Sequence, residues 1–118
     1  NNVQRSRKNL LKILQKIKNN GKKIAGYGAT AKAVTILNYC NINKDLIQNF
    51  IDITPEKINR YMPGKKIKIL KYNRNILNNY DYIFLGAWNF KEEIFNKEKK
   101  FIKRGGKFIT HIPQPKII

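Results

Sequence analysis

The chain has 118 residues, enough for one domain with a single hydrophobic core but not for the several domains of a multi-step enzyme. It carries 25 Lys and Arg against 7 Asp and Glu, a formal net charge of +18, so its surface attracts polyanions. The excess is mostly Lys, spread along the whole chain, and no motif of the common nucleic-acid-binding modules is visible. Nucleic-acid binding is therefore the less favoured interpretation.

Cysteine content and hydropathy restrict the kinds of site and the cellular location that we expect for this protein. Cys40 is the only cysteine, which excludes an internal disulfide and a multi-cysteine zinc site within this chain. No apolar run approaches the roughly 18 residues that cross a bilayer, and no signal peptide precedes the first element. We therefore expect a cytoplasmic protein with no membrane partner. Because the sequence begins at Asn1 without Met, we also expect a piece of a longer protein.

The first third of the chain predicts a helix, a strand and a second helix. Residues 3–19 place apolar side chains at helical spacing among basic ones, and Gly21 follows where this helix should end. Residues 23–27 predict a short buried strand, followed by a glycine turn and an alanine-rich helix over 31–39. This order is typical of a nucleotide-binding unit. We treat 1–21 as a leading amphipathic helix and 22–118 as the core of a single domain.

The rest of the chain continues the alternation. Residues 49–53 predict a strand that ends at Thr54-Pro55, and residues 66–70, "KIKIL", predict an edge strand. A weak helical turn over 74–77 leads to "YDYIFLGAW", an apolar run typical of a central strand. Residues 89–103 predict one amphipathic helix that Gly105-Gly106 ends, and "KFITHI" predicts the last strand.

This pattern predicts an α/β, Rossmann-like three-layer fold with a parallel sheet of about five strands. Right-handed crossovers with one reversal give the strand order 3-2-1-4-5. The carboxyl ends of the first and fourth strands then flank the switch point, where open α/β sheets bind ligands. Those ends carry Gly26-Tyr27-Gly28 and Trp88-Asn89. We expect the two segments to converge on one crevice.

The turn after the first strand is the strongest candidate site. Gly26-x-Gly28-x-x-Ala31 fits the loose form of a dinucleotide-binding fingerprint. Gly26 allows a tight turn, and Gly28 lets backbone N–H groups approach a phosphate at the positive end of the next helix. Lys32 adds a positive charge there. The alternative is that these small residues only let helix and strand pack closely.

Residues after the second strand extend this candidate site. Asp52 lies 24 positions after Gly28, where such sites commonly place an acid on a ribose hydroxyl. An equally good interpretation is that Asp52 caps the turn at Thr54. Lys57 and Tyr61 follow, and they either reach a phosphate and stack on a base or sugar, or are solvated surface residues.

At the other strand end, Trp88 is suited to stack on a ligand ring, and Asn89 is better explained as a cap of the following helix. His111, the only histidine, lies within the predicted last strand without a Ser or Cys partner in a nucleophile motif. We assign it no catalytic role. No paired carboxylates indicate an acid–base hydrolase, so we predict no catalytic residue and no metal ligand in this chain.

Four segments, "GYGATAKAVTILNYC", "IDITPEKINRYMPGKKIKI", "YDYIFLGAWNFKEEI" and "GGKFITHIPQPKII", together resemble the C-terminal domain of the sugar C-methyltransferase family. Members of that family transfer a methyl group from S-adenosylmethionine to a ring carbon of a nucleotide-linked keto-deoxysugar. The resemblance covers residues 22–118. It implies two upstream domains, one binding zinc and one binding the methyl donor and carrying the acid–base residues.

The resemblance also implies the roles of the candidate residues. The substrate is a nucleotide-diphosphate sugar, similar to a dTDP-sugar, and S-adenosylmethionine is bound by another domain, so this chain holds no cofactor and transfers no methyl group alone. We expect the substrate to be contacted by Gly26, Tyr27, Gly28, Ala29, Thr30 and Lys32 at the diphosphate, Lys57 at a phosphate, Asp52 or Tyr61 at the ribose or base, and Trp88 and Asn89 at the sugar. Two alternatives remain: a nicotinamide-dinucleotide-binding domain of an oxidoreductase, supported by the fingerprint and Asp52, and a basic nucleic-acid-binding module.

Overall fold

The computed structural model describes residues 2–111 and 116–118, which contain one sheet with helices on both of its faces. The strands are β1 (Ile24–Tyr27), β2 (Asn49–Asp52), β3 (Lys68–Lys71), β4 (Tyr82–Leu85), β5 (Lys107–Thr110) and β6 (Lys116–Ile117). The helices are α1 (Asn2–Asn19), α2 (Ala31–Tyr39), α3 (Lys91–Lys97) and α4 (Lys99–Lys103), with 3₁₀ turns η1 (Ile76–Asn79) and η2 (Trp88–Phe90).

The sheet has the predicted topology. Its order is β3-β2-β1-β4-β5-β6, and every neighbouring pair from β3 to β5 is parallel. The predicted order 3-2-1-4-5 is therefore confirmed, with β4 central and β3 at an edge. The structure adds β6, which pairs antiparallel with β5 through Thr110 and Lys116. A strand of only two residues has no periodicity from which it could be predicted.

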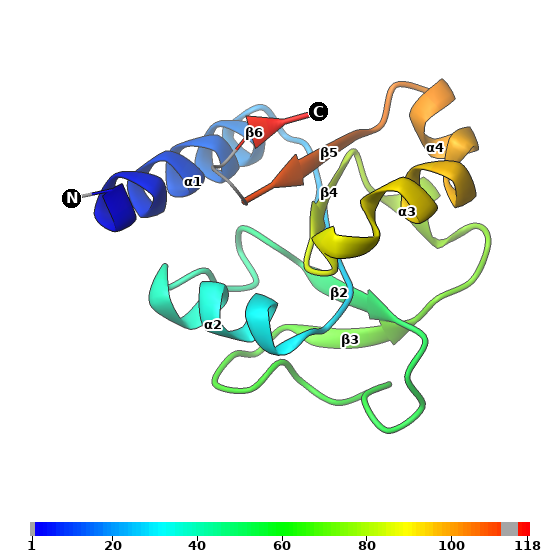
Figure 1. Cartoon of the computed structure of the whole chain (residues 1–118), viewed down its shortest axis with the longest axis horizontal. Coiled ribbons are helices and arrows are strands. Elements are labelled where there is room, and N and C mark those ends of the chain that lie inside the picture. The colour runs from blue at the N-terminus through cyan, green and yellow to red at the C-terminus, as the bar shows by residue number, and fades with distance from the viewer. Residues whose placement is uncertain (1, 112–115) are drawn as a thin grey trace.

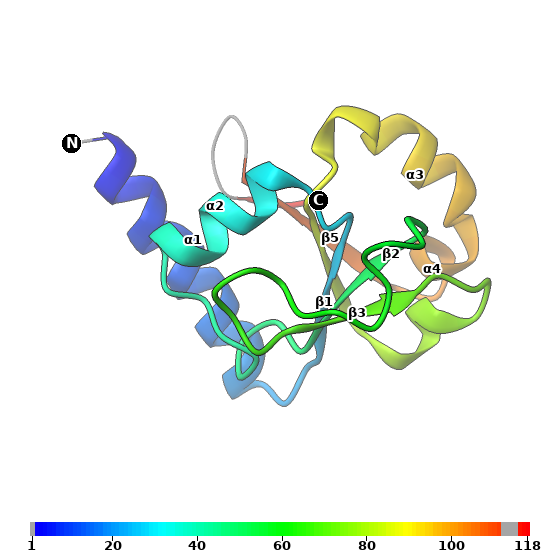
Figure 2. The same ribbon diagram turned by 90° about the horizontal axis from the view of Figure 1, so that it is seen from below.

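Helices cover both faces of the sheet (Figures 1 and 2). The first two helices lie on one face, and α3 and α4 lie on the other. Alternate residues along each strand supply the two cores, as expected for a sheet covered on both sides. Phe50 and Phe84 pack with α1 and α2, whereas Ile51, Ile83 and Phe108 pack with α3 and α4.

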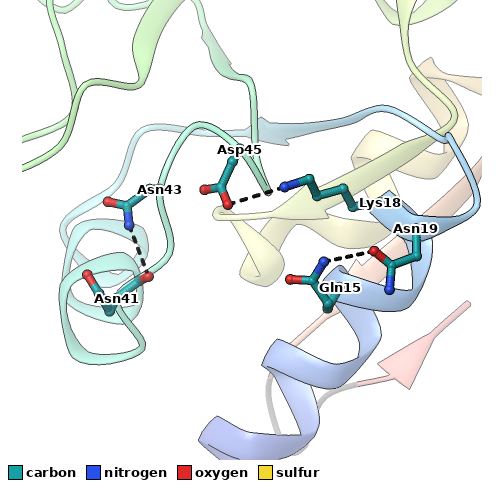
Figure 3. Close-up of polar contacts among 6 residues, drawn as sticks. All are labelled: Gln15, Lys18, Asn19, Asn41, Asn43 and Asp45. Carbon is teal, nitrogen blue, oxygen red and sulfur yellow. Dashed lines mark hydrogen bonds and ion pairs between the residues drawn. The ribbon is translucent and has the colours of Figure 1, made fainter.

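The leading helix is part of the first core. Leu10, Leu14 and Ile17 recur along one stripe of α1 and are buried in the cluster that contains Phe50 of the sheet. Polar contacts at the helix end are shown in Figure 3, where Lys18 forms an exposed ion pair of 3.4 Å with Asp45. Since exposed pairs of this kind contribute little, burial of the apolar stripe holds α1 in place.

Several predicted boundaries are wrong, including that of the edge strand, predicted over 66–70, which spans Lys68–Lys71. The helix over 89–103 is broken into η2, α3 and α4, because Glu98 has φ −106° and ψ 36° and ends α3. The helical turn expected over 74–77 lies slightly later, as η1. The last strand ends at Thr110, so His111 follows the strand. The predicted strand residue Ile112 and the tail prolines Pro113 and Pro115 lie outside the described residues.

Candidate functional site

A cleft of about 360 Å³ opens at the carboxyl edge of the sheet, on the face that α3 covers. Its walls come from the ends of β1 and β2, the segment after β3, the loop after β4, and α3, which together surround the switch point. Five of the predicted binding residues line it: Tyr27, Gly28, Thr30, Asp52 and Lys57.

The two glycines of the turn are required by close packing. Gly26 lies within β1, and a Cβ at this position would overlap the ring of Phe50. Gly28 has φ +95°, and a Cβ there would lie 2.7 Å from the Cβ of Ala87 in the loop after β4. The conformation and the contact both favour glycine at position 28. These contacts match the packing alternative for the turn.

Two backbone N–H groups of the turn are already paired. Gly28 donates to the carbonyl of Ile51 at 2.9 Å, and Ala29 donates to Oδ2 of Asp52 at 2.7 Å. These two groups therefore have protein acceptors rather than facing a ligand. The N–H groups of Ala31 and Lys32 belong to the first turn of α2, where a helix has no acceptor of its own.

Asp52 connects two loops. Its Oδ1 accepts from the N–H of Ile53 at 2.7 Å and from the N–H and hydroxyl of Thr54 at 2.9 and 2.8 Å. With the bond from Ala29, the carboxylate accepts four hydrogen bonds, about its full capacity. Burial acts to raise the pKa of Asp52, but these hydrogen bonds outweigh burial and lower the pKa. The capping alternative is what the structure shows.

Lys57 holds the other side of the same peptide segment. Its Nζ donates to the carbonyl of Ala29 at 2.7 Å, so Ala29 is held by Asp52 at its N–H and by Lys57 at its carbonyl. Lys57 also lines a second hollow of about 580 Å³ beside α2, which Tyr61 lines as well. Tyr61 is 58% exposed there. Lys32 is exposed on α2 and lines neither hollow.

Thr30 joins the turn to the loop after β4. As the N-cap of α2, its hydroxyl accepts from the N–H of Ala33 at 3.2 Å, and it donates to the carbonyl of Gly86 at 2.7 Å. The loops after β1 and β4 thus meet, as predicted for the two strand ends that flank the switch point.

The structure describes the predicted site residues after β4 only in part. The backbone of Trp88 begins η2, and its side chain lies outside the described part of the structure. Asn89 is exposed within the same turn. The N-cap residue of α3 is Phe90, without a side-chain cap, so the prediction that Asn89 caps the helix is wrong.

Comparison with known proteins decides the family. Residues 1–113 match the family model described as the C-methyltransferase C-terminal domain. The chain belongs to this family. It is 34% identical over 115 residues to the C-methyltransferase NovU of Streptomyces niveus, and the match covers 98% of this chain and 27% of NovU. The chain therefore spans about a quarter of that relative, and the resemblance recognised in the four segments is confirmed.

This C-methyltransferase domain also contains a polar cluster that sequence reasoning missed. Tyr27 and Tyr72 both donate their hydroxyls to Oε2 of Glu98, at 3.1 and 2.8 Å, and Glu98 is only 6% exposed. Burial, the Glu98 charge and the hydrogen bond raise the pKa of Tyr27 well above its ordinary value. Burial, the hydrogen bond to Glu98 and the Glu98 charge raise the pKa of Tyr72 to about 12. Nothing in the local sequence around three such distant residues signals that they meet.

Neither a three-residue metal cluster nor a membrane-spanning helix is present among the residues that the structure describes. Within residues 2–111 and 116–118, no group of three His, Cys, Asp or Glu side chains is arranged to hold a metal ion. None of the helices in the part of the chain that the structure describes has the length and apolar character needed to span a membrane.

Proposed function

We propose that this chain is the nucleotide-sugar-binding domain of an S-adenosylmethionine-dependent C-methyltransferase that acts on a nucleotide-linked keto-deoxysugar. The observation that carries the proposal is the cleft at the switch point of a domain in the C-methyltransferase family. The loops after β1 and β4 meet here and form part of the cleft wall, and α/β domains bind ligands at this place.

The proposed contacts follow from the residues that line the cleft and its surroundings. The diphosphate lies along Gly26, Tyr27, Gly28, Ala29 and Thr30, and reaches the N–H groups of Ala31 and Lys32 in the first turn of α2. Lys32 and Lys57 supply positive charge from the two sides of this turn. Four further residues complete the proposal: Asp52 and Tyr61 near the ribose or base, and Trp88 with Asn89 on the sugar side.

The chemical step is proposed for other parts of a longer, cytoplasmic protein. S-adenosylmethionine supplies an electrophilic methyl group, and we place its site, the acid–base residues and a zinc site in upstream domains. The chain itself binds and orients the sugar nucleotide, with no cofactor of its own. Incubating the chain alone with labelled S-adenosylmethionine and a keto-sugar nucleotide should give background incorporation, and turnover above background would contradict this division of roles.

The central test is calorimetric titration of the full-length polypeptide with dTDP-glucose and, separately, with NAD. We expect saturable binding of dTDP-glucose and none of NAD. The reverse result would indicate the dinucleotide-binding alternative, which loses one of its two supports because Asp52 already accepts four protein hydrogen bonds. Tight, steeply salt-dependent binding of duplex or single-stranded DNA without dTDP-glucose binding would instead indicate the nucleic-acid-binding alternative.

A further inference from the structure

One wall of the cleft is fixed by a group that faces away from it. Tyr27 at the end of β1 and Tyr72 just after β3 both line the cleft, and both hydroxyls reach the same oxygen of Glu98. Glu98 lies at the junction of α3 and α4 and does not line the cleft. The ammonium group of Lys97 lies 3.9 Å from the centroid of the Tyr72 ring. Tyr72 is thus held at its hydroxyl by Glu98 and on its ring by Lys97.

The buried carboxylate makes this arrangement rigid. A charge removed from water is costly unless hydrogen bonds replace its hydration, so Glu98 favours the conformation that keeps both phenol donors. The two rings consequently stand in a fixed relation, with centroids 6.0 Å apart and planes at 68°. A wall whose rotamers are set by contacts outside the binding space is organised before a ligand arrives.

Beside the charged side chains of Glu93 and Lys97, the lining of the cleft includes two exposed apolar side chains at its mouth. Ile53 and Phe90 line it from opposite loops and are 72% and 56% exposed, although both are large apolar side chains. Ile51 and Ile94 lie buried behind them. A flat ring placed between Phe90 and the two tyrosines would remove this apolar surface from water and meet aromatic partners.

We propose that the cleft takes the base of the nucleotide, and that Glu98 is a positioning residue that holds Tyr27 and Tyr72 in the wall against which the base packs. This inference rests on the proposed function and changes it in two places: Tyr27 packs against the base instead of the diphosphate, and Tyr61, which lines the hollow beside α2, does not contact the base. Lys57 and Thr30 line the same cleft, so a phosphate joined to the base meets a cation and the start of α2 without leaving it.

The first test compares variants of the full-length polypeptide by calorimetric titration with dTDP. Glu98→Ala removes the acceptor and should weaken dTDP binding about tenfold. Glu98→Gln keeps a carbonyl oxygen for the two hydroxyls and should restore binding to within about threefold of the parent. A purely structural Glu98 would change the thermal midpoint in both variants but leave the affinity of the folded protein unchanged, which would overturn the positioning role.

A second variant keeps the test valid where Glu98→Ala does not fold. Phe90→Ala removes an exposed ring at the mouth and should weaken dTDP binding about fivefold with little change in thermal midpoint. The matched control is Ile102→Ala, because Ile102 is 41% exposed on α4 and does not line the cleft. Equal affinities for parent, Phe90→Ala and Ile102→Ala would overturn the placement of the base.

Ligand-observed saturation-transfer NMR with dTDP-glucose locates the base directly. In the parent, the thymine protons should receive more saturation than the glucose protons, and Tyr72→Leu should reverse that order. Stronger saturation of glucose in the parent would overturn this inference alone, since dTDP-glucose would still bind. Failure of the parent to bind dTDP-glucose at all would overturn the proposed function together with it.

Discussion

The carboxylate of Asp52 accepts a hydrogen bond from the backbone N–H of Ala29 at 2.7 Å, across the gap between the loops that follow β2 and β1. Its second oxygen is bonded to Ile53 and Thr54 of its own loop. One side chain therefore fixes two of the segments that form the cleft. The carboxylate holds the loops of the site in place, and its oxygens are occupied by protein donors rather than free to accept from a ligand.

Asp52→Asn should destabilise the domain clearly. The substitution removes the charge and replaces one acceptor oxygen by a donor, so either the bond from Ala29 or the bonds from Ile53 and Thr54 are lost, and the remaining ones lose their charged acceptor. We expect the free energy of unfolding to fall by about 2 kcal/mol, as for hydrogen bonds to a charged group. Asp45→Asn is the matched control, because Asp45 forms only the exposed pair with Lys18 and should cost less than about 0.5 kcal/mol. Urea unfolding of both variants and the parent measures the difference, and equal losses would contradict the role of Asp52.

The same carboxylate predicts a loss of stability in acid. The pKa of Asp52 is lower in the folded state than its ordinary value of 3.8. Its contribution is therefore present above that value and is lost as pH falls through the folded pKa. Between about pH 5 and pH 2, the free energy of unfolding should fall more steeply for the parent than for Asp52→Asn. Parallel curves from urea titrations across this range would show that Asp52 titrates alike in both states.

Gly28 and Gly105 allow backbone strain to be separated from steric overlap. They have φ +95° and +98°, but a Cβ at Gly105 meets nothing within 4 Å, whereas one at Gly28 meets Ala87. Gly105→Ala should cost about 1 kcal/mol for the left-handed conformation alone. Gly28→Ala should cost a further 1 to 3 kcal/mol, roughly the range for overpacking. Chemical denaturation gives both values.

The overlap at Gly28 also predicts a rescue. Ala87→Gly removes the nearest atom, so the double variant Gly28→Ala with Ala87→Gly should recover part of the loss that Gly28→Ala causes. Losses that simply add would indicate that conformation alone selects glycine at position 28.

Most of the fold was predictable because it depends on local patterns. Apolar runs of strand length alternate with amphipathic segments, and the right-handed crossover rule leaves few orders for five parallel strands. The break at Glu98 was not predictable, because residues 89–103 have helical spacing throughout and only the distant partners Tyr27 and Tyr72 draw Glu98 inward. The tertiary contact overrides the local propensity at that point.

The place of the candidate site was predictable, but its internal bonding was not. Topology alone brings the ends of β1 and β4 together, so Gly28 and the loop that contains Ala87 had to meet. The sequence cannot distinguish a glycine turn whose N–H groups face a ligand from one whose N–H groups are paired. In this domain the N–H groups of Gly28 and Ala29 are paired, because Ile51 and Asp52 of β2 supply acceptors beside them.

Tyr72 predicts a loss of stability in alkali. Its pKa rises from an ordinary value of 10.0 to about 12 in the folded state. A raised pKa contributes stability below the ordinary value, and that contribution disappears as pH rises through the folded pKa. The difference in the free energy of unfolding between the parent and Tyr72→Phe should therefore shrink between about pH 10 and pH 12. Urea unfolding of both proteins at several pH values measures it, and a constant difference would show that the pKa of Tyr72 is not raised in the folded state.

The last prediction compares the two lysines beside the glycine turn. Lys57 is half-buried, lines the cleft and donates to the carbonyl of Ala29 at 2.7 Å, whereas Lys32 is exposed on α2. Lys57→Met keeps most of the apolar stem but removes the donor, so the free energy of unfolding should fall by about 1 kcal/mol. Lys32→Met should leave it unchanged.

Binding should separate the same two variants. If the diphosphate lies along the turn, Lys57→Met should weaken dTDP-glucose binding by about tenfold, since it removes a cation and loosens Ala29. Lys32→Met should weaken it modestly, by about two- to threefold, because an exposed cation is screened by solvent and salt. Raising the salt concentration should narrow the difference between the parent and Lys32→Met. A larger loss for Lys32→Met than for Lys57→Met would place the diphosphate on the α2 side of the turn, outside the cleft.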